Sequence, residues 1–115
     1  MDQMNDVFES VARYFALLSE PTRLRIMHSI CQQEKSVNQI VDELGASQTN
    51  VSRHLGLMYQ AGVLGRRKDG NQVLYRVTDA AFTEICRTVC VRVAAELEGD
   101  KSLKRGLKSL INELS

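Results

Sequence analysis

Near the middle of the chain, residues 47–54 carry side chains whose types and spacing suit contacts with double-stranded DNA. Glutamine and asparagine pair with adenine through two hydrogen bonds, and arginine pairs with guanine in the same way. Serine and threonine hydroxyls suit contacts with phosphate oxygens. Between Ser47 and Lys68 the chain has no acidic residue that would repel a phosphate backbone. The candidate DNA-binding residues of this stretch are Ser47, Gln48, Thr49, Asn50, Ser52, Arg53 and His54.

A second cluster of candidate DNA-binding residues follows closely, and its members are Arg66, Arg67, Lys68 and Asn71. Residues 47–77 hold five basic side chains and one acidic one, although the formal charge of the whole chain is only +1. A local basic surplus on a nearly neutral protein indicates contact with a polyanion in one place. Charge alone is equally compatible with a solvated face that carries scattered arginines.

Three cysteines, Cys31, Cys86 and Cys90, offer a different chemistry, and their odd number argues against a disulfide framework. Cys86 and Cys90 are four residues apart, so they would face the same side of a helix. Thiolates bind trivalent arsenic, antimony or another soft ion, which makes these two the candidate metal ligands; no cofactor is expected to be required. The same thiols suit a persulfide or oxidant sensor. The alternative is that all three are small buried hydrophobic residues.

The elements that must position these residues are short helices and one hairpin. Apolar residues at three- and four-residue steps predict a first helix over about 5–18. Caps and periodicity predict further helices from Pro21 to about 32, from Ser36 to Gly45, from Ser47 to Gly62, from Thr78 to about 97 and over 101–115. Residues 63–68 and 72–77 read as two strands joined by a tight turn. The predicted fold class is mainly α with a small β-hairpin, in the order α-α-α-α-β-β-α-α.

The third and fourth predicted helices match a helix-turn-helix unit, because only Gly45 and Ala46 separate them. In such a unit the second helix enters the major groove and its first residues face base edges. This arrangement places residues 47–54 against the bases and the basic hairpin tip near an adjacent groove or the phosphates. A short helical hairpin with a solvated ribbon is the alternative.

Three segments together resemble the ArsR/SmtB family of winged-helix repressors over about residues 8–97: Ser-Glu-Pro-Thr-Arg-Leu-Arg-Ile-Met at 19–27, Ser-Gln-Thr-Asn-Val-Ser-Arg-His-Leu at 47–55, and the basic hairpin at 66–77. The resemblance implies a winged helix-turn-helix, a homodimer through the first and fifth helices, operator binding, and release by an inducer. It also implies that residues 47–54 open the recognition helix and that residues 66–72 form the wing. A two-fold dimer predicts a near-palindromic operator.

Many members of that family bind metals, and the matching positions here differ. A cysteine motif on the third helix corresponds to residues 36–38, which are Ser, Val and Asn, so that thiolate site is absent. A second zinc site on the fifth helix corresponds to Asp79, Ala81, Arg92 and Ala95. Only Asp79 is of a ligand type, and it is better interpreted as a helix cap.

The two histidines and the layout of the thiols complete the comparison with that family. His28 and His54 have no ligand-spaced neighbour; His54 is expected to contact DNA and His28 to pack partly buried. Some family members sense persulfides with one cysteine on the second helix and one on the fifth. Cys31 with Cys86 or Cys90 matches that layout but not its register.

The length of 115 residues fits a single domain, 1–115, with a winged-helix core at 5–98 and a C-terminal helical extension at 100–115. The polar N-terminus and the lack of a long apolar run predict a cytoplasmic protein without a membrane partner. No enzyme motif occurs. We therefore expect a sequence-specific repressor released by a thiol-reactive signal. The alternatives are a regulator with structural cysteines and another inducer or none, and a protein-interaction winged helix.

Overall fold

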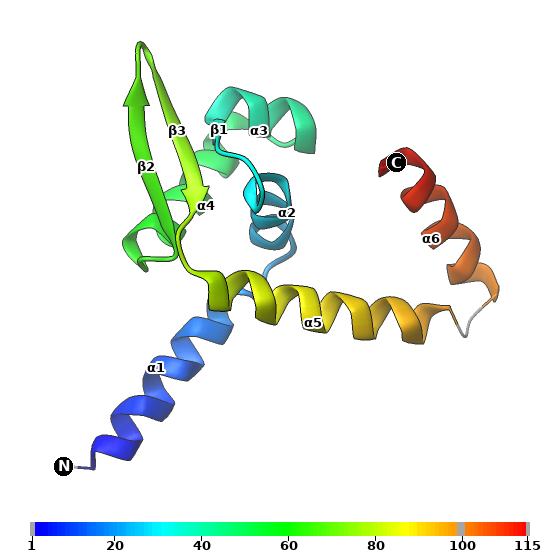
Figure 1. Cartoon of the computed structure of the whole chain (residues 1–115), viewed down its shortest axis with the longest axis horizontal. Coiled ribbons are helices and arrows are strands. Elements are labelled where there is room, and N and C mark those ends of the chain that lie inside the picture. Colours follow the sequence, from blue (N-terminus) through cyan, green and yellow to red (C-terminus); the bar gives the residue numbers. More distant parts are fainter. Residues whose placement is uncertain (1, 99–100, 115) are drawn as a thin grey trace. The chain divides into compact units, whose positions relative to one another are not determined.

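The computed structural model describes residues 2–98 and 101–114. Its elements, in chain order, are α1 (Gln3–Leu17), α2 (Pro21–Ile30), β1 (Lys35–Ser36), α3 (Val37–Leu44), α4 (Gln48–Gln60), β2 (Leu64–Asp69), β3 (Gln72–Val77), α5 (Ala80–Leu97) and α6 (Lys101–Leu114). The chain forms two compact units, and the boundary between them lies after Thr83, within α5. The predicted mainly helical fold with a β-hairpin is confirmed (Figure 1).

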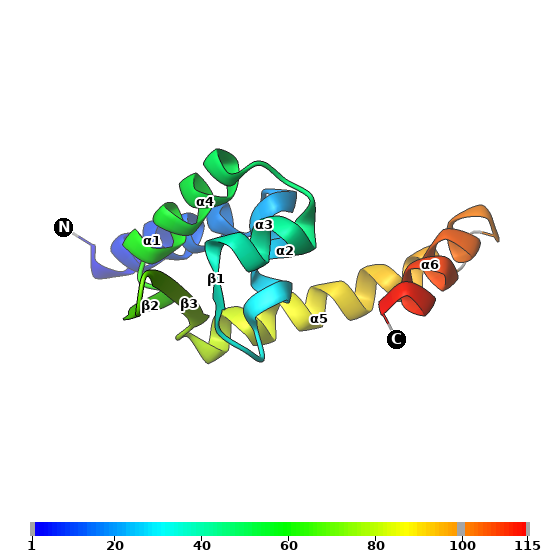
Figure 2. The same cartoon turned by 90° about the horizontal axis from the view of Figure 1, so that it is seen from above.

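Side chains and glycines at the helix ends determine where the central helices begin and end. The hydroxyl of Ser36 accepts a hydrogen bond from the backbone N–H of Gln39. The side-chain oxygen of Gln39 in turn accepts one from the backbone N–H of Ser36, so these two N–H groups at the start of α3 are satisfied. Gly45 ends α3 in the left-handed conformation at φ 67°. Ser47 caps α4, because its hydroxyl accepts a hydrogen bond from the backbone of Asn50. The turn therefore joins two adjacent helices, which Figure 2 shows from above.

The sheet contains one more strand than the sequence predicted. The short β1 pairs with β3 on the side away from β2, with Lys35 opposite Tyr75 and Ser36 opposite Leu74. A strand of two residues has no periodicity, so only pairing with the hairpin reveals it. The turn of the hairpin is also tighter than predicted, because Asp69 pairs with Gln72.

One residue of that turn, Gly70, has a positive φ, whereas its neighbour Asn71 does not. Gly70 adopts φ 64°, and no non-glycine residue in the described part of the chain has a positive φ. A positive φ at the first central position alone is the pattern of a type II′ turn, which suits a two-residue hairpin loop.

The hydrophobic core of residues 2–83 joins α2, α3, α4, the hairpin and the first turn of α5. Its largest fully buried side chains are Phe82, Ile26, Ile30, Ile40, Leu55, Met58, Val51 and Val63. Three of these lie on α4 at steps of four and three residues, so they occupy one face of that helix. The burial of this face leaves the opposite face of α4 in solvent.

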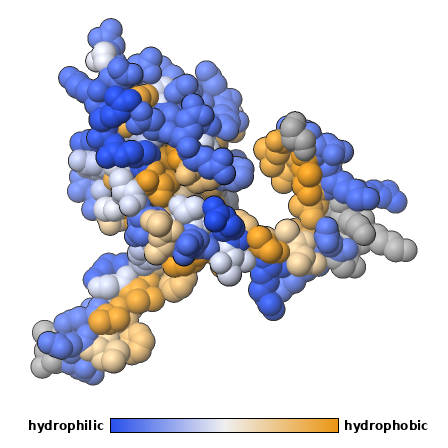
Figure 3. All heavy atoms as spheres, viewed as in Figure 1, coloured by the Kyte–Doolittle hydropathy of each residue, from blue (hydrophilic) through white to orange (hydrophobic). Residues whose placement is uncertain are grey.

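The face of α1 that carries its apolar residues is exposed. Phe8 is 63% and Phe15 52% exposed, and Met4, Val7 and Val11 are also exposed. Figure 3 shows hydrophobic surface along this helix. Large apolar side chains also remain exposed on α5 and, among the described side chains, on α6. None of the helices in the described chain combines the length and the apolar character that a membrane span requires.

Candidate nucleic-acid interface

The N-terminal half of α4 presents most of the predicted DNA-binding residues at the surface. Ser47, Gln48, Thr49, Ser52 and Arg53 are exposed, and Asn50 is half-buried. Asn50 and Arg53 form a pair on this surface, because Nη2 of Arg53 donates to Oδ1 of Asn50 at 2.8 Å. The hydroxyl of Ser47 also caps α4, since its Oγ accepts a hydrogen bond from the backbone N–H of Asn50 at 3.2 Å. A polar surface without acidic groups therefore covers the start of α4.

The structure places His54, one of the predicted DNA contacts, in the interior of the protein. His54 is 2% exposed, because it lies three residues after Val51 and next to Leu55 on the inner face of α4. Burial lowers the pKa of His54, and the guanidinium groups of Arg53 and Arg23 act in the same direction against the opposing carboxylate of Glu20. A neutral imidazole therefore lies beneath the exposed surface of α4.

The other histidine also differs from the expectation. His28 is exposed on α2, whereas its neighbours Met27 and Ser29 are buried. The packing role expected for this side chain is wrong, because position 28 falls on the solvent side of the helix.

The three basic residues of the hairpin do not act as one cluster. Neighbouring residues of a strand point to opposite faces, so Arg66 and Lys68 share one face and Arg67 occupies the other. The guanidinium of Arg66 lies over the ring of Tyr59 from α4, 3.9 Å from its centroid. This cation–π contact packs the side chain of Arg66 against the end of α4.

Arg67 is paired with an acidic residue that precedes β1. Its Nε donates to both carboxylate oxygens of Glu34 at 3.1 Å, and its Nη2 forms an ion pair with the same carboxylate. The hydrogen bond from Arg67 lowers the pKa of the Glu34 carboxyl, and Arg76 contributes through its charge. No sequence motif marks Glu34 or Tyr59, and the contact between Glu34 and Arg67 joins residues that are 33 positions apart.

The tip of the hairpin carries the two remaining candidates, Lys68 and Asn71. Both side chains are exposed. Asn71 occupies the turn, and Lys68 lies opposite Val73 on β3. The tip therefore offers a cation and an amide to solvent.

The three free thiols occupy different environments. Cys31 is half-buried at the end of α2, and its Sγ donates to the carbonyl oxygen of His28 at 3.3 Å. Cys86 is buried, and this burial raises the pKa of its thiol, with a smaller contribution from Cys90. Cys90 is exposed one turn further along α5. In the described part of the chain, no group of three His, Cys, Asp or Glu side chains is placed to hold a metal ion.

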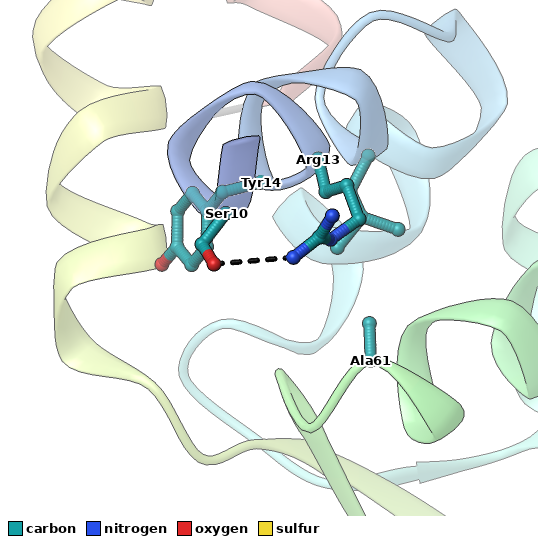
Figure 4. A pocket seen from close by; sticks show the side chains of 5 residues that line it. Ser10, Arg13, Tyr14 and Ala61 are labelled. Carbon is teal, nitrogen blue, oxygen red and sulfur yellow. Dashed lines mark hydrogen bonds between the residues drawn. The ribbon is translucent and has the colours of Figure 1, made fainter. Parts of the chain in front are cut away.

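A pocket of about 360 Å³ lies between α1 and the end of α4. Arg13 reaches into this space and donates to Oγ of Ser10 at 3.1 Å (Figure 4). The other lining residues are Tyr14, Leu17 and Ala61. None of the predicted DNA-binding residues or thiols lines this pocket.

Asp79 has the capping role that the sequence analysis predicted. Its Oδ1 accepts a hydrogen bond from the backbone of Ala81 at 3.0 Å, at the start of α5. Its Oδ2 accepts from the hydroxyl of Tyr14 at 3.0 Å, which connects α1 to the start of α5. Both carboxylate oxygens of Asp79 therefore take part in structural contacts.

Residues 20–64 match the model of the arsR family of bacterial regulatory proteins. The chain is 32% identical over 83 residues to the uncharacterized HTH-type transcriptional regulator MJ1325 of Methanocaldococcus jannaschii, covering 71% of this chain and 93% of that protein. It is 32% identical over 77 residues to a probable mercury resistance operon repressor of Streptomyces lividans, covering 67% of this chain and 62% of the repressor.

Solved structures agree with this assignment. The solution structure of the homodimeric winged helix-turn-helix DNA-binding domain of Mb0332 from Mycobacterium bovis superposes with a TM-score of 0.76 at 25% identity, over 86% of this chain and 92% of that one. The crystal structure of Rv0081 from Mycobacterium tuberculosis superposes with a TM-score of 0.69 at 28% identity, over 84% and 96%. The predicted winged helix-turn-helix fold and the prediction of a regulator, not an enzyme, are confirmed. The chain belongs to the arsR family of bacterial regulatory proteins.

Proposed function

We propose that this chain is a homodimeric repressor that binds a near-palindromic operator and leaves it when a thiol-reactive signal arrives. The exposed polar surface at the start of α4 carries this proposal. It presents two amides, an arginine and three hydroxyls without a carboxylate, and the residues are Ser47, Gln48, Thr49, Asn50, Ser52 and Arg53. These groups match base edges and phosphates, and the buried face of α4 holds them on a rigid element.

The hairpin supplies the wing in this proposal. Lys68 and Asn71 at its tip suit phosphate or minor-groove contacts, because both are exposed. Arg66 joins them from the face that packs on α4, and Arg67 joins once its pairing with Glu34 is released. His54 is not among the proposed direct contacts.

The exposed apolar face of α1 supports the homodimer. Phe8 and Phe15 together with Val11 form a surface of a kind that soluble monomers seldom leave in water. Mb0332, with the same fold, is described as homodimeric. In a two-fold dimer two α4 helices are about 34 Å apart, one turn of DNA, so each half of the operator reads as the inverted repeat of the other.

Cys86 and Cys90 are the proposed receptors of the signal, and they lie one turn apart on α5. Cys90 is accessible, whereas Cys86 is buried and this burial raises the pKa of its thiol. Two sulfur ligands suit a soft ion such as trivalent arsenic or antimony, and an accessible thiol also suits a persulfide or oxidant. The similarity to a probable mercury resistance operon repressor supports the soft-ion class. We place the protein in the cytoplasm, together with its DNA.

The test begins with a duplex selected by the full-length protein from a random pool. Wild type should bind it in a salt-dependent manner and should be released by at least one of arsenite, antimonite, a mercuric salt or a persulfide donor. A Cys86→Ser/Cys90→Ser variant should bind equally well and resist release, and Cys31→Ser is the matched control. Salt-independent or absent binding contradicts the repressor, and equal responses of wild type and double variant contradict the thiol sensor.

A further inference from the structure

A partly buried polar bridge connects the end of α1 to the exposed polar surface of α4. It begins at Arg23 on α2, whose Nε donates to the carbonyl oxygen of Leu17 at 2.7 Å and whose Nη2 donates to that of Ala16 at 3.1 Å. Nη1 of the same guanidinium lies 3.2 Å from Nδ1 of His54. The side chains of Arg23 and His54 thus connect the last carbonyl groups of α1 to the inner face of α4.

The opposite side of the His54 ring faces the DNA-reading surface. Its Nε2 lies 3.3 Å from Nη2 of Arg53 and 3.6 Å from Oε2 of Glu20. The same Nη2 of Arg53 donates to Asn50. Nη2 belongs to both of the edges with which a guanidinium forms two hydrogen bonds to guanine, so its partners determine how Arg53 meets a base.

The two arginine contacts of His54 cannot both be hydrogen bonds at the same time. A guanidinium only donates, and a neutral imidazole has a single acceptor nitrogen. When Nδ1 accepts from Arg23, Nε2 carries the proton and faces the carboxylate of Glu20. When Nε2 accepts from Arg53, Nδ1 carries the proton and the bond to Arg23 is lost. The ring is bonded either to the α1 side or to the DNA side.

We propose that His54 is a positioning residue for Arg53, and that DNA binding shifts its ring from the tautomer bonded to Arg23 to the tautomer bonded to Arg53. Glu20 favours the first tautomer in free protein, because its carboxylate faces Nε2. A guanine that replaces Asn50 as a partner of Nη2 takes one hydrogen of this nitrogen, leaves the other for the ring and favours the second tautomer. One proton leaves Nε2 and one joins Nδ1 by exchange with water, so the ring stays neutral.

This inference rests on the proposed function, since it assigns His54 a role in reading the operator through Arg53. Coupling of this kind is reciprocal. A displacement of the end of α1 that moves Arg23 toward the ring therefore weakens the hold on Arg53, and sequence reading is linked to the position of α1.

Two variants at position 54 separate a positioning role from a purely structural one. The amide of His54→Gln extends to the place of Nε2 and can accept from Arg53, whereas the shorter amide of His54→Asn reaches only the place of Nδ1. We expect His54→Asn to lower the affinity ratio between the selected duplex and a scrambled one by about tenfold, the value of one good base contact, and His54→Gln to retain the ratio. In an Arg53→Ala background the two variants should not differ.

The tautomer itself is measurable by ¹⁵N NMR of the imidazole nitrogens in the full-length protein. The chain has two histidines, and exposed His28 serves as the internal reference. The selected duplex should move the His54 signals toward unprotonated Nε2, and the scrambled duplex should not. An unchanged tautomer, equal affinity ratios for the Asn and Gln variants, or the same loss with and without Arg53 overturns the inference alone. Failure of wild type to select any duplex overturns the proposed function as well.

Discussion

Replacing Glu34 with glutamine removes the carboxylate that holds Arg67 on the wing. In wild type, Nε of Arg67 donates to both oxygens of Glu34 at 3.1 Å, so this guanidinium must leave an intramolecular partner before it neutralises a phosphate. In Glu34→Gln the wing presents Arg67 as a free cation. We therefore expect this variant to bind DNA more tightly than wild type at low salt.

The magnitude follows from counterion release. In wild type the carboxylate that Arg67 leaves behind takes up a cation, which cancels the counterion released from the phosphate. Without this carboxylate, the slope of log association constant against log salt becomes steeper by about 0.9 per subunit. At 0.1 M salt this corresponds to about eightfold tighter binding for each subunit that makes the contact. Because a phosphate contact carries no sequence information, the gain should be equal on selected and scrambled duplexes.

The assay is fluorescence anisotropy with labelled duplexes between 50 mM and 400 mM salt. Glu96→Gln is the matched control, because it makes the same change in net charge on α5, where Glu96 faces Arg92 at 3.5 Å. An unchanged slope for Glu34→Gln, or weaker binding than wild type, refutes the reasoning. Weaker binding would mean that Glu34 holds Arg67 in the orientation that DNA requires.

Three further predictions concern stability and assembly. Gly65→Ala should lower the free energy of unfolding by roughly 1–3 kcal/mol, because its Cβ would lie 2.8 Å from Cγ2 of Thr78. The Cβ of Gly56→Ala meets no atom within 4 Å, so this variant should raise the free energy of unfolding by about 0.5–1 kcal/mol. Urea titrations of both variants measure these changes. Burial holds the pKa of His54 below its unfolded value, so unfolding takes up a proton and Tm should fall as pH decreases below about 6.5; a His54→Gln variant with the same pH profile as wild type contradicts this. Phe8→Asp places a charge on the exposed apolar face of α1 and should raise the dimer dissociation constant at least about tenfold, and sedimentation that shows an unaltered dimer excludes this face from the interface.

Local sequence signals were sufficient for most of the helix boundaries. Ser36 and Gln39 satisfy each other's backbone groups within one turn, Gly45 supplies the positive φ that ends α3, and Ser47 caps α4. Each of these interactions joins residues at most four positions apart, so the sequence order alone specifies them. The surface at the start of α4 was identified for the same reason, because the spacing of Val51, Leu55 and Met58 determines which face remains outside.

The candidate site was only partly predictable, because its remaining features depend on long-range contacts. His54 was predicted to contact DNA from its residue type and its place in residues 47–54. The packing of α4 on α2 instead buries its ring against Arg23. The composition of the wing suggested three equivalent cations, but the strand register and Glu34 distinguish Arg67 from the other two. The sequence by itself determined the elements and the polar surface of α4. The tertiary structure decided which of these side chains are free for DNA, since ion pairs and burial join residues that are more than thirty positions apart.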